Sequence, residues 1–244
     1  AIMTRSYHQW FSPNLQKNME LLVFGHTGTR VLFFPTRAAR FYDYEDWGVI
    51  AAIQDKIEAG YLQVFCVDSV DAESLYNEYI TPRERIERHI AYEHYIVQEV
   101  IPFMHQINPF SDMISAGCSL GAYHAINVAM KYPHYFCKAV GMSGRYDLTW
   151  ATGYFRDLFS GYHDEDIYFN TPIQFIPNLQ DETILSNLRK MDIILAIGQE
   201  DAFLENNIHF SEILNHKDIH HHLYVWDEEA HEARYWRKMV QIYL

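Results

Sequence analysis

The pentapeptide Gly117-Cys118-Ser119-Leu120-Gly121 lies between a strand-like run and a helix-like run. Asp112–Ala116 is typical of a short buried strand, and residues 122–131 carry apolar side chains at helical spacing. In this setting a G-x-S-x-G pattern predicts a sharp strand-to-helix turn, whose small residues let two backbone segments approach closely. Such a turn lifts the serine hydroxyl out of the sheet, and the N-terminal dipole of the helix favours negative charge nearby. We interpret Ser119 as a nucleophile; the alternative is a glycine-rich turn that holds an ordinary serine.

Strand-like and helix-like segments alternate along most of the chain. Further strands are expected at Met19–Phe24, Arg30–Phe34, Tyr61–Val67, Lys138–Met142, Met191–Ile197 and His222–Trp226, and helices at about 47–59, 82–107, 203–214 and from the last strand to Tyr243. This alternation predicts an α/β fold with a mostly parallel sheet covered by helices on both faces. The first two of these strands are separated by Gly25–Thr29 and are expected to form an antiparallel hairpin at one edge. Pro82 suits the first turn of the long helix, and Pro102 is expected to kink it or to end its regular part.

Residues 1–244 are interpreted as one domain, because the chain has no internal repeat, low-complexity tract or linker. The segment at about 144–190 is too long for an ordinary connection and is rich in aromatic residues, among them Trp150, Tyr154, Phe155, Phe159 and Phe175. It is a candidate lid or pocket wall, or a set of short helices that the aromatic side chains pack onto the core, and both can hold.

Composition narrows the classes of partner. With 19 Lys and Arg against 32 Asp and Glu, the net charge of −13 argues against binding along a nucleic-acid backbone. No stretch approaches the roughly 20 apolar residues that span a bilayer, and the N-terminal residues lack a signal-peptide core. We therefore expect a cytoplasmic protein, unless a leader has been removed.

The three cysteines lack C-x-x-C spacing, so we expect free thiols, with Cys66 and Cys137 buried, and neither a disulfide framework nor a zinc site.

An activated serine needs a base and an acid that orients the base. On a strand–turn–helix nucleophile these partners are expected later in the chain, acid first and then histidine, each on a loop after a strand. Asp201 follows the strand at Met191–Ile197, and His231 follows the last strand. Glu200 is the alternative acid.

Other residues compete less well for these roles. Asp227 and Glu229 lie too near His231 in the sequence to orient it. The consecutive histidines 220–222 cannot all face one site, and no spaced ligand pattern nearby supports a metal there. His124, in the helix after the pentapeptide, is interpreted as a packing or surface residue.

A tetrahedral intermediate also needs two backbone N–H donors. Leu120, the residue after the nucleophile, is expected to supply one. The other should come from the loop after Phe34, where Pro35 has no N–H to donate; we choose Arg37, with Thr36 as the alternative. The Arg37 and Arg40 side chains could attract an acidic group of a substrate, or pair with surface carboxylates.

The chain resembles the bacterial esterase D-like branch of the α/β-hydrolases, which includes mycolyltransferases and feruloyl esterases. The resemblance runs from Met19 onward and is carried by residues 117–121, Tyr168-Phe169-Asn170-Thr171-Pro172, Gly198-Gln199-Glu200-Asp201 with Leu204 and Asn206, and His231 with Trp236. It implies an α/β-hydrolase fold and a carboxylic-ester hydrolase without a cofactor, in which Ser119, Asp201 and His231 form the triad.

Three departures from the family pattern concern the surroundings of the triad. Pro35-Thr36 replaces the usual His-Gly pair before the oxyanion hole, Ala230 replaces the usual glycine before the histidine, and Ala233 stands where an aromatic residue is expected. These departures put the second oxyanion donor and the shape of the pocket in question.

The expected function is a serine esterase that forms an acyl-enzyme with a small-molecule ester, without a nucleic-acid or membrane partner. An acyltransferase or a thioesterase would use the same triad, and a catalytically silent binding protein could share the fold. The acyl and alcohol groups and the oligomeric state, a homo-oligomer included, stay open.

Overall fold

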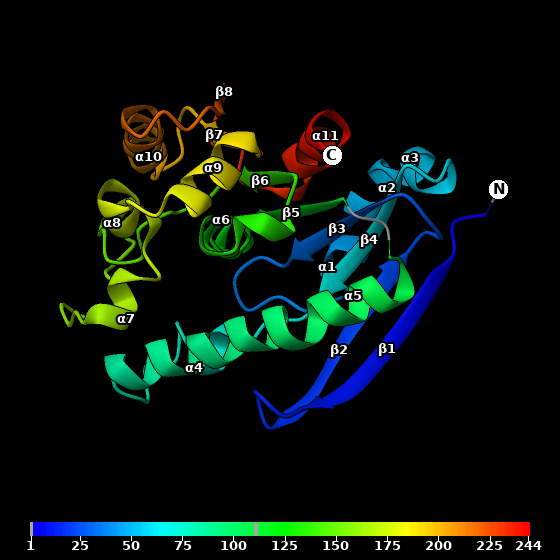
Figure 1. The fold of residues 1–244 in the computed structure, drawn as a ribbon, viewed down its shortest axis with the longest axis horizontal. Coiled ribbons are helices and arrows are strands. Elements are labelled where there is room, and N and C mark those ends of the chain that lie inside the picture. Colours follow the sequence, from blue (N-terminus) through cyan, green and yellow to red (C-terminus); the bar gives the residue numbers. More distant parts are fainter. Residues whose placement is uncertain (1, 110–111) are drawn as a thin grey trace.

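Eight strands form one mixed sheet within the described residues, 2–109 and 112–244 of a computed structural model (Figure 1). Their order across the sheet is β1-β2-β4-β3-β5-β6-β7-β8. The pairs β1–β2 and β2–β4 are antiparallel, and every later pair is parallel. The strands are β1 (Arg5–Ser12), β2 (Lys17–Phe24), β3 (Thr29–Phe34), β4 (Leu62–Val67), β5 (Met113–Cys118), β6 (Lys138–Met142), β7 (Asp192–Gly198) and β8 (His222–Trp226).

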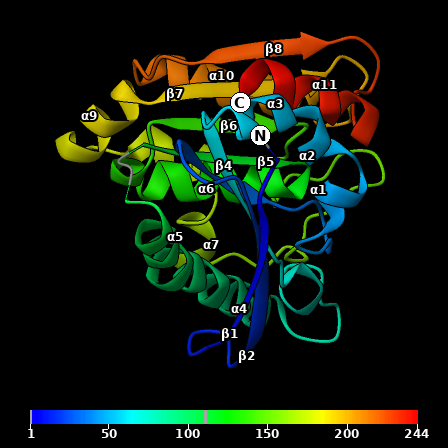
Figure 2. The same ribbon diagram turned by 90° about the vertical axis from the view of Figure 1, so that its right-hand side faces the viewer.

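The sheet twists along this order, so that β1 and β2 run crosswise to β7 and β8 (Figure 2). The expected α/β-hydrolase architecture, mostly parallel with an antiparallel N-terminal edge, is confirmed. The pairing at that edge differs from expectation. The hairpin joins β1 to β2, and β2 and β3 are not neighbours because β4 lies between them. The predicted hairpin between Met19–Phe24 and Arg30–Phe34 is therefore wrong: the chain does reverse direction at Gly25–Thr29, but β3 lies one strand position away from β2, with β4 paired to both.

Helices cover both faces of the sheet, and successive side chains of each central strand alternate between them. Leu32 and Phe34 of β3 pack toward one group of helices, whereas Val31 and Phe33 pack toward the other. The first group comprises α4 (Pro82–Tyr95), α5 (Ile101–Ile107), α6 (Leu120–Lys131), α8 (Pro172–Phe175), α9 (Glu182–Lys190) and α10 (Leu204–His216). The second comprises α1 (Asp43–Asp46), α2 (Val49–Ala52), α3 (Gln54–Glu58) and α11 (Ala233–Tyr243).

The long helix predicted at 82–107 forms as two α-helical parts joined by a π-helical turn, η2 (Ile96–Val100). A capping box between Thr81 and Glu84 starts it, with Pro82 in the first turn as expected. Pro102 does not end the helix, because α5 continues to Ile107. The irregularity at this proline is a π-helical turn. The wider π turn lies directly before it, where a proline removes a backbone donor and crowds the preceding turn.

The aromatic-rich segment at 144–190 forms short helices, as one of the two interpretations expects: α7 (Glu165–Tyr168), α8, α9 and the 3₁₀ turn η4 (Ile176–Asn178). Phe159 and Phe175 are buried, whereas Tyr154 and Phe155 are exposed. The remaining 3₁₀ turns are η1 (Asp71–Glu73) and η3 (Pro133–Tyr135). No helix of the described residues is both long enough and apolar enough to cross a bilayer.

A buried tyrosine ties the ends of the two central strands together. The Tyr44 hydroxyl donates to the carbonyl of Phe34 at the end of β3 (2.6 Å) and accepts from the amide of Cys118 at the end of β5 (3.0 Å). Burial raises the pKa of Tyr44 well above its usual value, so the hydroxyl keeps its proton. Its ring stacks on Phe33, with the ring centroids 3.9 Å apart.

We expect Tyr44→Phe to lower the free energy of unfolding by about 1–3 kcal/mol, because it leaves a buried amide and a buried carbonyl without their hydrogen-bond partner. The matched control is Tyr95→Phe. Tyr95 is equally buried, but its hydroxyl has no hydrogen-bond partner among the described residues, so its loss should change stability by less than about 1 kcal/mol. Urea unfolding of both variants makes the comparison. Equal losses would contradict the bridging role of Tyr44.

Candidate active site

Ser119 sits on a strained turn between β5 and α6, as the pentapeptide predicts. Its backbone has φ 58° and ψ −124°, a conformation that costs free energy for a residue with a side chain. Its amide donates to the carbonyl of Met142 on β6 (2.8 Å). This local strain is the geometry of a nucleophile elbow, which holds the serine side chain above the edge of the sheet.

The glycines of the pentapeptide allow two close backbone approaches. A Cβ atom on Gly117 would lie 2.2 Å from the carbonyl oxygen of Gly121. A Cβ atom on Gly121 would lie 2.3 Å from the carbonyl oxygen of Phe34. Any other residue at either position would push apart the turn, the helix and the end of β3.

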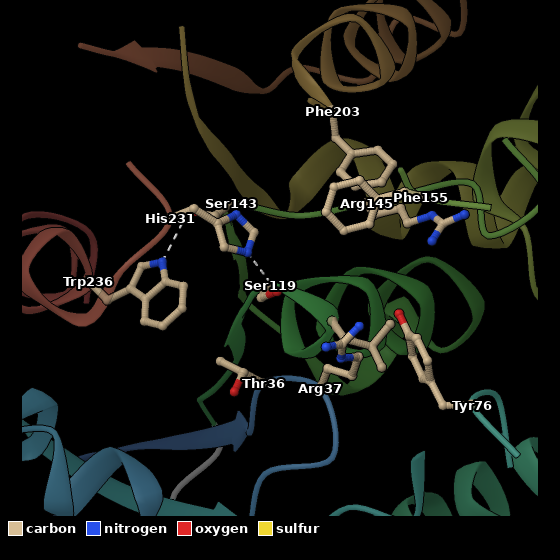
Figure 3. Close-up of a pocket in the computed structure, with 11 residues that line it drawn as sticks. Thr36, Arg37, Tyr76, Ser119, Ser143, Arg145, Phe155, Phe203, His231 and Trp236 are labelled. Atoms are coloured by element: carbon tan, nitrogen blue, oxygen red, sulfur yellow. Dashed lines mark hydrogen bonds between the residues drawn. The ribbon is translucent and has the colours of Figure 1, made fainter. Parts of the chain in front are cut away.

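His231 lies between Ser119 and Asp201. Its Nε2 is 3.0 Å from Ser119 Oγ (Figure 3). Its Nδ1 donates to Asp201 Oδ2 at 2.8 Å. The Asp201 side chain is 4% exposed and His231 28%, so the acid is enclosed while the base is accessible. The other Asp201 oxygen accepts from the amide of Phe203 (2.9 Å), which fixes the orientation of the carboxylate. The structure thus brings together the three residues predicted as nucleophile, acid and base.

The competing residues lie elsewhere. Glu200 is exposed, and its amide donates to the carbonyl of Glu228. His124 is buried, and its Nε2 donates to Asp71 Oδ1 at 2.8 Å. His221 bonds to Ser211 Oγ and to the carbonyl of Ile219. Within residues 2–109 and 112–244, no group of three or more His, Cys, Asp or Glu side chains is arranged to hold a metal ion.

The loop that carries His231 is fastened by a residue that the sequence analysis missed. Ser143, directly after β6, donates from Oγ to the carbonyl of Ala230 (2.6 Å) and accepts from Nε1 of Trp236 (3.0 Å). Ala230, where the family usually has glycine, has φ 50°, in the left-handed region that favours glycine. Only its position at the carboxyl end of a parallel strand could have pointed to Ser143.

The loop after β3 lies across the elbow. Thr36 and Arg37 line the same pocket as Ser119 and Leu120. Within the described part of the chain, the amides of Thr36, Arg37 and Leu120 have no hydrogen-bond partner. The backbone N–H groups of both candidates for the second oxyanion donor, Arg37 and Thr36, are therefore available to a ligand at this edge of the pocket.

A buried carboxylate holds this loop from behind. Asp71 Oδ2 accepts from the amide of Ala38 (3.1 Å), while its other oxygen accepts from His124. Ala38 has φ 52°, so the loop turns sharply just after the residues that line the pocket. Asp71 is 1% exposed, and it was not singled out from the sequence.

A pocket of about 350 Å³ opens at Ser119 (Figure 3). Phe155 comes from the aromatic-rich segment, so this segment both packs on the core and supplies a wall of the pocket. The residues that line the pocket are Thr36, Arg37, Tyr76, Ser119, Leu120, Ser143, Arg145, Phe155, Phe203, His231 and Trp236.

The two arginines of the loop after β3 differ in their partners. Arg40 pairs with Asp68 and Glu20, at 3.0 and 2.9 Å. Arg37 has no ion pair among the described residues, and its guanidinium lies over the ring of Tyr76. Of these two arginines, Arg37 is therefore the one that an acidic group of a substrate could pair with.

The cysteines take no part in this constellation. Cys66 and Cys118 are buried free thiols, and burial raises the pKa of each thiol far above its usual value. Cys137 is exposed, which corrects the expectation that it is buried: it lies in the connection before β6, outside the strand.

Comparison with known proteins identifies the family and the fold. The family model described as "Putative esterase" matches residues 44–240, most of the chain. A search of curated protein sequences found no match.

Solved structures share the fold across nearly the whole chain at low identity. A ferulic acid esterase superposes with a TM-score of 0.77 at 16% identity, covering 98% of this chain and 95% of that chain. An S-formylglutathione hydrolase from Agrobacterium tumefaciens gives 0.76 at 15%, covering 99% and 94%. The fluorophosphonate-binding serine hydrolase F of Staphylococcus aureus gives 0.74 at 17%, covering 99% and 97%. The expected resemblance is confirmed: the chain belongs to the esterase family of the α/β-hydrolases.

Proposed function

We propose that this protein is a serine carboxylic-ester hydrolase that acts through an acyl-enzyme. The observation that carries the proposal is the pair of contacts at His231, 3.0 Å to Ser119 Oγ and 2.8 Å to Asp201 Oδ2. One imidazole can then take the serine proton on one nitrogen while the carboxylate holds its other N–H and its tautomer. Membership of the esterase family supports the same reaction class.

The reaction proceeds in two halves. His231 Nε2 takes the proton as Ser119 Oγ attacks the ester carbonyl carbon. The tetrahedral intermediate then collapses: its bond to the alcohol oxygen breaks, and His231 returns the proton to the departing alcohol. In the second half, water loses a proton to His231 and attacks the acyl-enzyme, and the acid leaves as Ser119 regains its proton.

Backbone amides stabilise the oxyanion in both halves. Leu120, the first residue of α6, supplies one N–H, and Arg37 supplies the other, with Thr36 as the alternative donor. The N-terminal dipole of α6 acts in the same direction. The proposal involves no metal or cofactor, because the nucleophile, base, acid and amides account for every proton transfer and for the developing charge.

A fluorophosphonate probe should add one phosphonyl group to the wild-type protein and none to Ser119→Ala, as read by intact mass. Ser6→Ala is the control: this serine is exposed on β1 and its side chain bonds to His8, so labelling should be unchanged. A wild-type protein that neither takes the label nor hydrolyses short-chain aryl esters would exclude the proposed activity. Parallel assays of aryl esters and aryl thioesters, with and without an added alcohol, separate the esterase from the thioesterase and acyltransferase alternatives.

Asp201→Asn should lower kcat by about 10³–10⁴-fold, since the amide favours the wrong imidazole tautomer while the fold is kept. Glu200→Gln, one residue earlier and exposed, should leave kcat near the wild-type value. Steady-state kinetics on one aryl ester measure both. The reverse ranking would assign the acid to Glu200.

Ser143→Ala should lower kcat by about 10- to 100-fold with little change in KM, because the Ala230–His231 turn loses its anchor and the base shifts from Ser119. The matched control is Ser115→Ala, which also removes a buried hydrogen bond from a serine to a carbonyl, but in the middle of β5. The rate of fluorophosphonate labelling should fall in parallel with kcat. Equal kinetic effects of the two variants would argue against a positioning role for Ser143.

A further inference from the structure

The pocket at Ser119 is positively charged in an acidic protein. The chain carries 32 Asp and Glu against 19 Lys and Arg, yet two guanidinium groups and no carboxylate are found among the described residues that line the pocket. These groups belong to Arg37 and Arg145, and neither forms an ion pair within residues 2–109 and 112–244. Unlike Arg40, neither is in ion-pair contact with a carboxylate of the described residues, and Asp147 and Asp157 act on Arg145 only from a longer distance.

Arg145 is a buried cation in the wall of the pocket. It is 6% exposed, and its guanidinium lies 5.0 Å from the centroid of the Phe203 ring. Nη2 donates to the carbonyls of Leu148 and Trp150 at 3.2 and 3.1 Å, and Nε reaches the carbonyl of Asp147 at 3.4 Å. A further bond from Nη2 goes to the carbonyl of Arg156.

These bonds use one edge of the guanidinium, and Nη1 takes part in none of them. Burial lowers the pKa of Arg145, but a guanidinium stays protonated in proteins. Carbonyl dipoles, Tyr76 and the more distant carboxylates of Asp147 and Asp157 compensate this buried charge only in part, because burial still lowers the pKa. An anionic group placed against the Nη1 edge would offset the remaining cost.

Tyr76 joins the two arginines. The Arg37 guanidinium lies 5.1 Å from the centroid of the Tyr76 ring. Burial raises the pKa of Tyr76, while the positive charges of Arg145 and Arg37 act in the opposite direction, so both cations lie close to this side chain. The hydroxyl therefore keeps its proton and can donate beside them. Figure 3 shows Tyr76, Arg37 and Arg145 around the same side of the pocket.

This side of the pocket lies away from the base. In Figure 3, His231 and Trp236 are on one side of Ser119, and Arg145 and Tyr76 are on the other. The leaving alcohol must depart next to His231, because His231 Nε2 returns the proton to it. The acyl part then extends toward the arginines, past the apolar rings of Phe155 and Phe203, whose centroids lie 4.9 Å apart.

We propose that the pocket binds an acyl group whose far end is anionic, with Arg37, Arg145 and Tyr76 as the anion-binding subsite. The substrate class is then a monoester of a dicarboxylic acid, or of an acid with an equivalent terminal anion. Hydrolysis adds water across the ester bond, which yields the free alcohol and a diacid. The assignment of the subsite to the acyl part rests on the proposed esterase function.

Arg145 also holds the segment at 147–156 through the carbonyls that it binds, so its replacement can disturb the fold. Arg37 offers a cleaner test, because its side chain is exposed and its recorded side-chain contact is the ring of Tyr76. Arg37→Gln removes the charge and keeps the backbone amide, whereas Arg37→Lys keeps the charge. Arg40→Gln is the matched control: it lies on the same loop, and Asp68 and Glu20 already neutralise it.

The substrates are matched pairs that differ by one charge: the monomethyl esters of succinic, glutaric and adipic acid, and the same esters with the free carboxylate replaced by carboxamide. The ratio of kcat/KM within each pair, measured by methanol release, reports recognition of the anion and cancels general effects on catalysis. For at least one chain length, the wild-type protein should favour the carboxylate by about tenfold or more, as a charged hydrogen bond allows. Salt should weaken the preference.

Arg37→Gln should reduce that ratio by about tenfold, Arg37→Lys should keep part of it, and Arg40→Gln should leave it unchanged. A wild-type ratio near one, or an unchanged ratio in Arg37→Gln, overturns the subsite. A second pair places the anion on the alcohol, acetoxyacetate against acetoxyacetamide. A stronger preference in this pair overturns the assignment to the acyl part.

Calorimetric titration with glutarate and adipate separates this proposal from the esterase function. The Ser119→Ala variant should bind a dicarboxylate, and Ser119→Ala with Arg37→Gln should bind it at least about tenfold more weakly. Turnover of the neutral esters without dicarboxylate binding overturns the subsite and leaves the esterase function standing. Binding that depends on Arg37, without turnover of any ester, overturns the esterase function and the acyl assignment while the anion site stands.

Discussion

The site depends on the close approach of two backbone segments, the turn after β5 and the end of β3. At Gly121 only a hydrogen atom fits against the carbonyls of Phe34 and Pro35. This approach sets Ser119 and the amide of Leu120 beside the loop that carries Arg37, so the proposed nucleophile and the proposed oxyanion donors are held by the same backbone contact. Tyr44 fastens the same two strand ends from the opposite side of the sheet, through a hydroxyl that bonds to both.

Much of this arrangement could be predicted from the sequence, because its signals are local. The glycines around Ser119 mark the turn. Asp201 and His231 each follow a strand that can be recognised in the sequence from its run of apolar residues. The pairing of the N-terminal strands was not predictable in this way. The turn residues at 25–29 suggest a hairpin, whereas the insertion of β4 between β2 and β3 depends on contacts across the whole sheet.

The supporting residues escaped prediction for a related reason. Ser143 and Asp71 act through contacts with segments distant in the sequence, and Arg145 binds carbonyls of the irregular segment that follows it. None of the three belongs to a spaced motif. The charge of the pocket is similarly hidden in the composition. The net charge of −13 is a sum over the whole sequence, whereas the wall of the pocket beside Ser119 carries two guanidinium groups.

The bond between Trp236 and Ser143 has a consequence for how the protein is made. A ribosome releases a chain from its N-terminus, so β5, the elbow and Ser119 emerge well before the helix that carries Trp236. Until residues 231–236 have emerged and α11 has docked, Ser119 lacks its partner His231, and Ser143 lacks the hydrogen bond from Trp236. Under the proposed mechanism, the growing chain therefore carries an unactivated serine until α11 has been made and has docked.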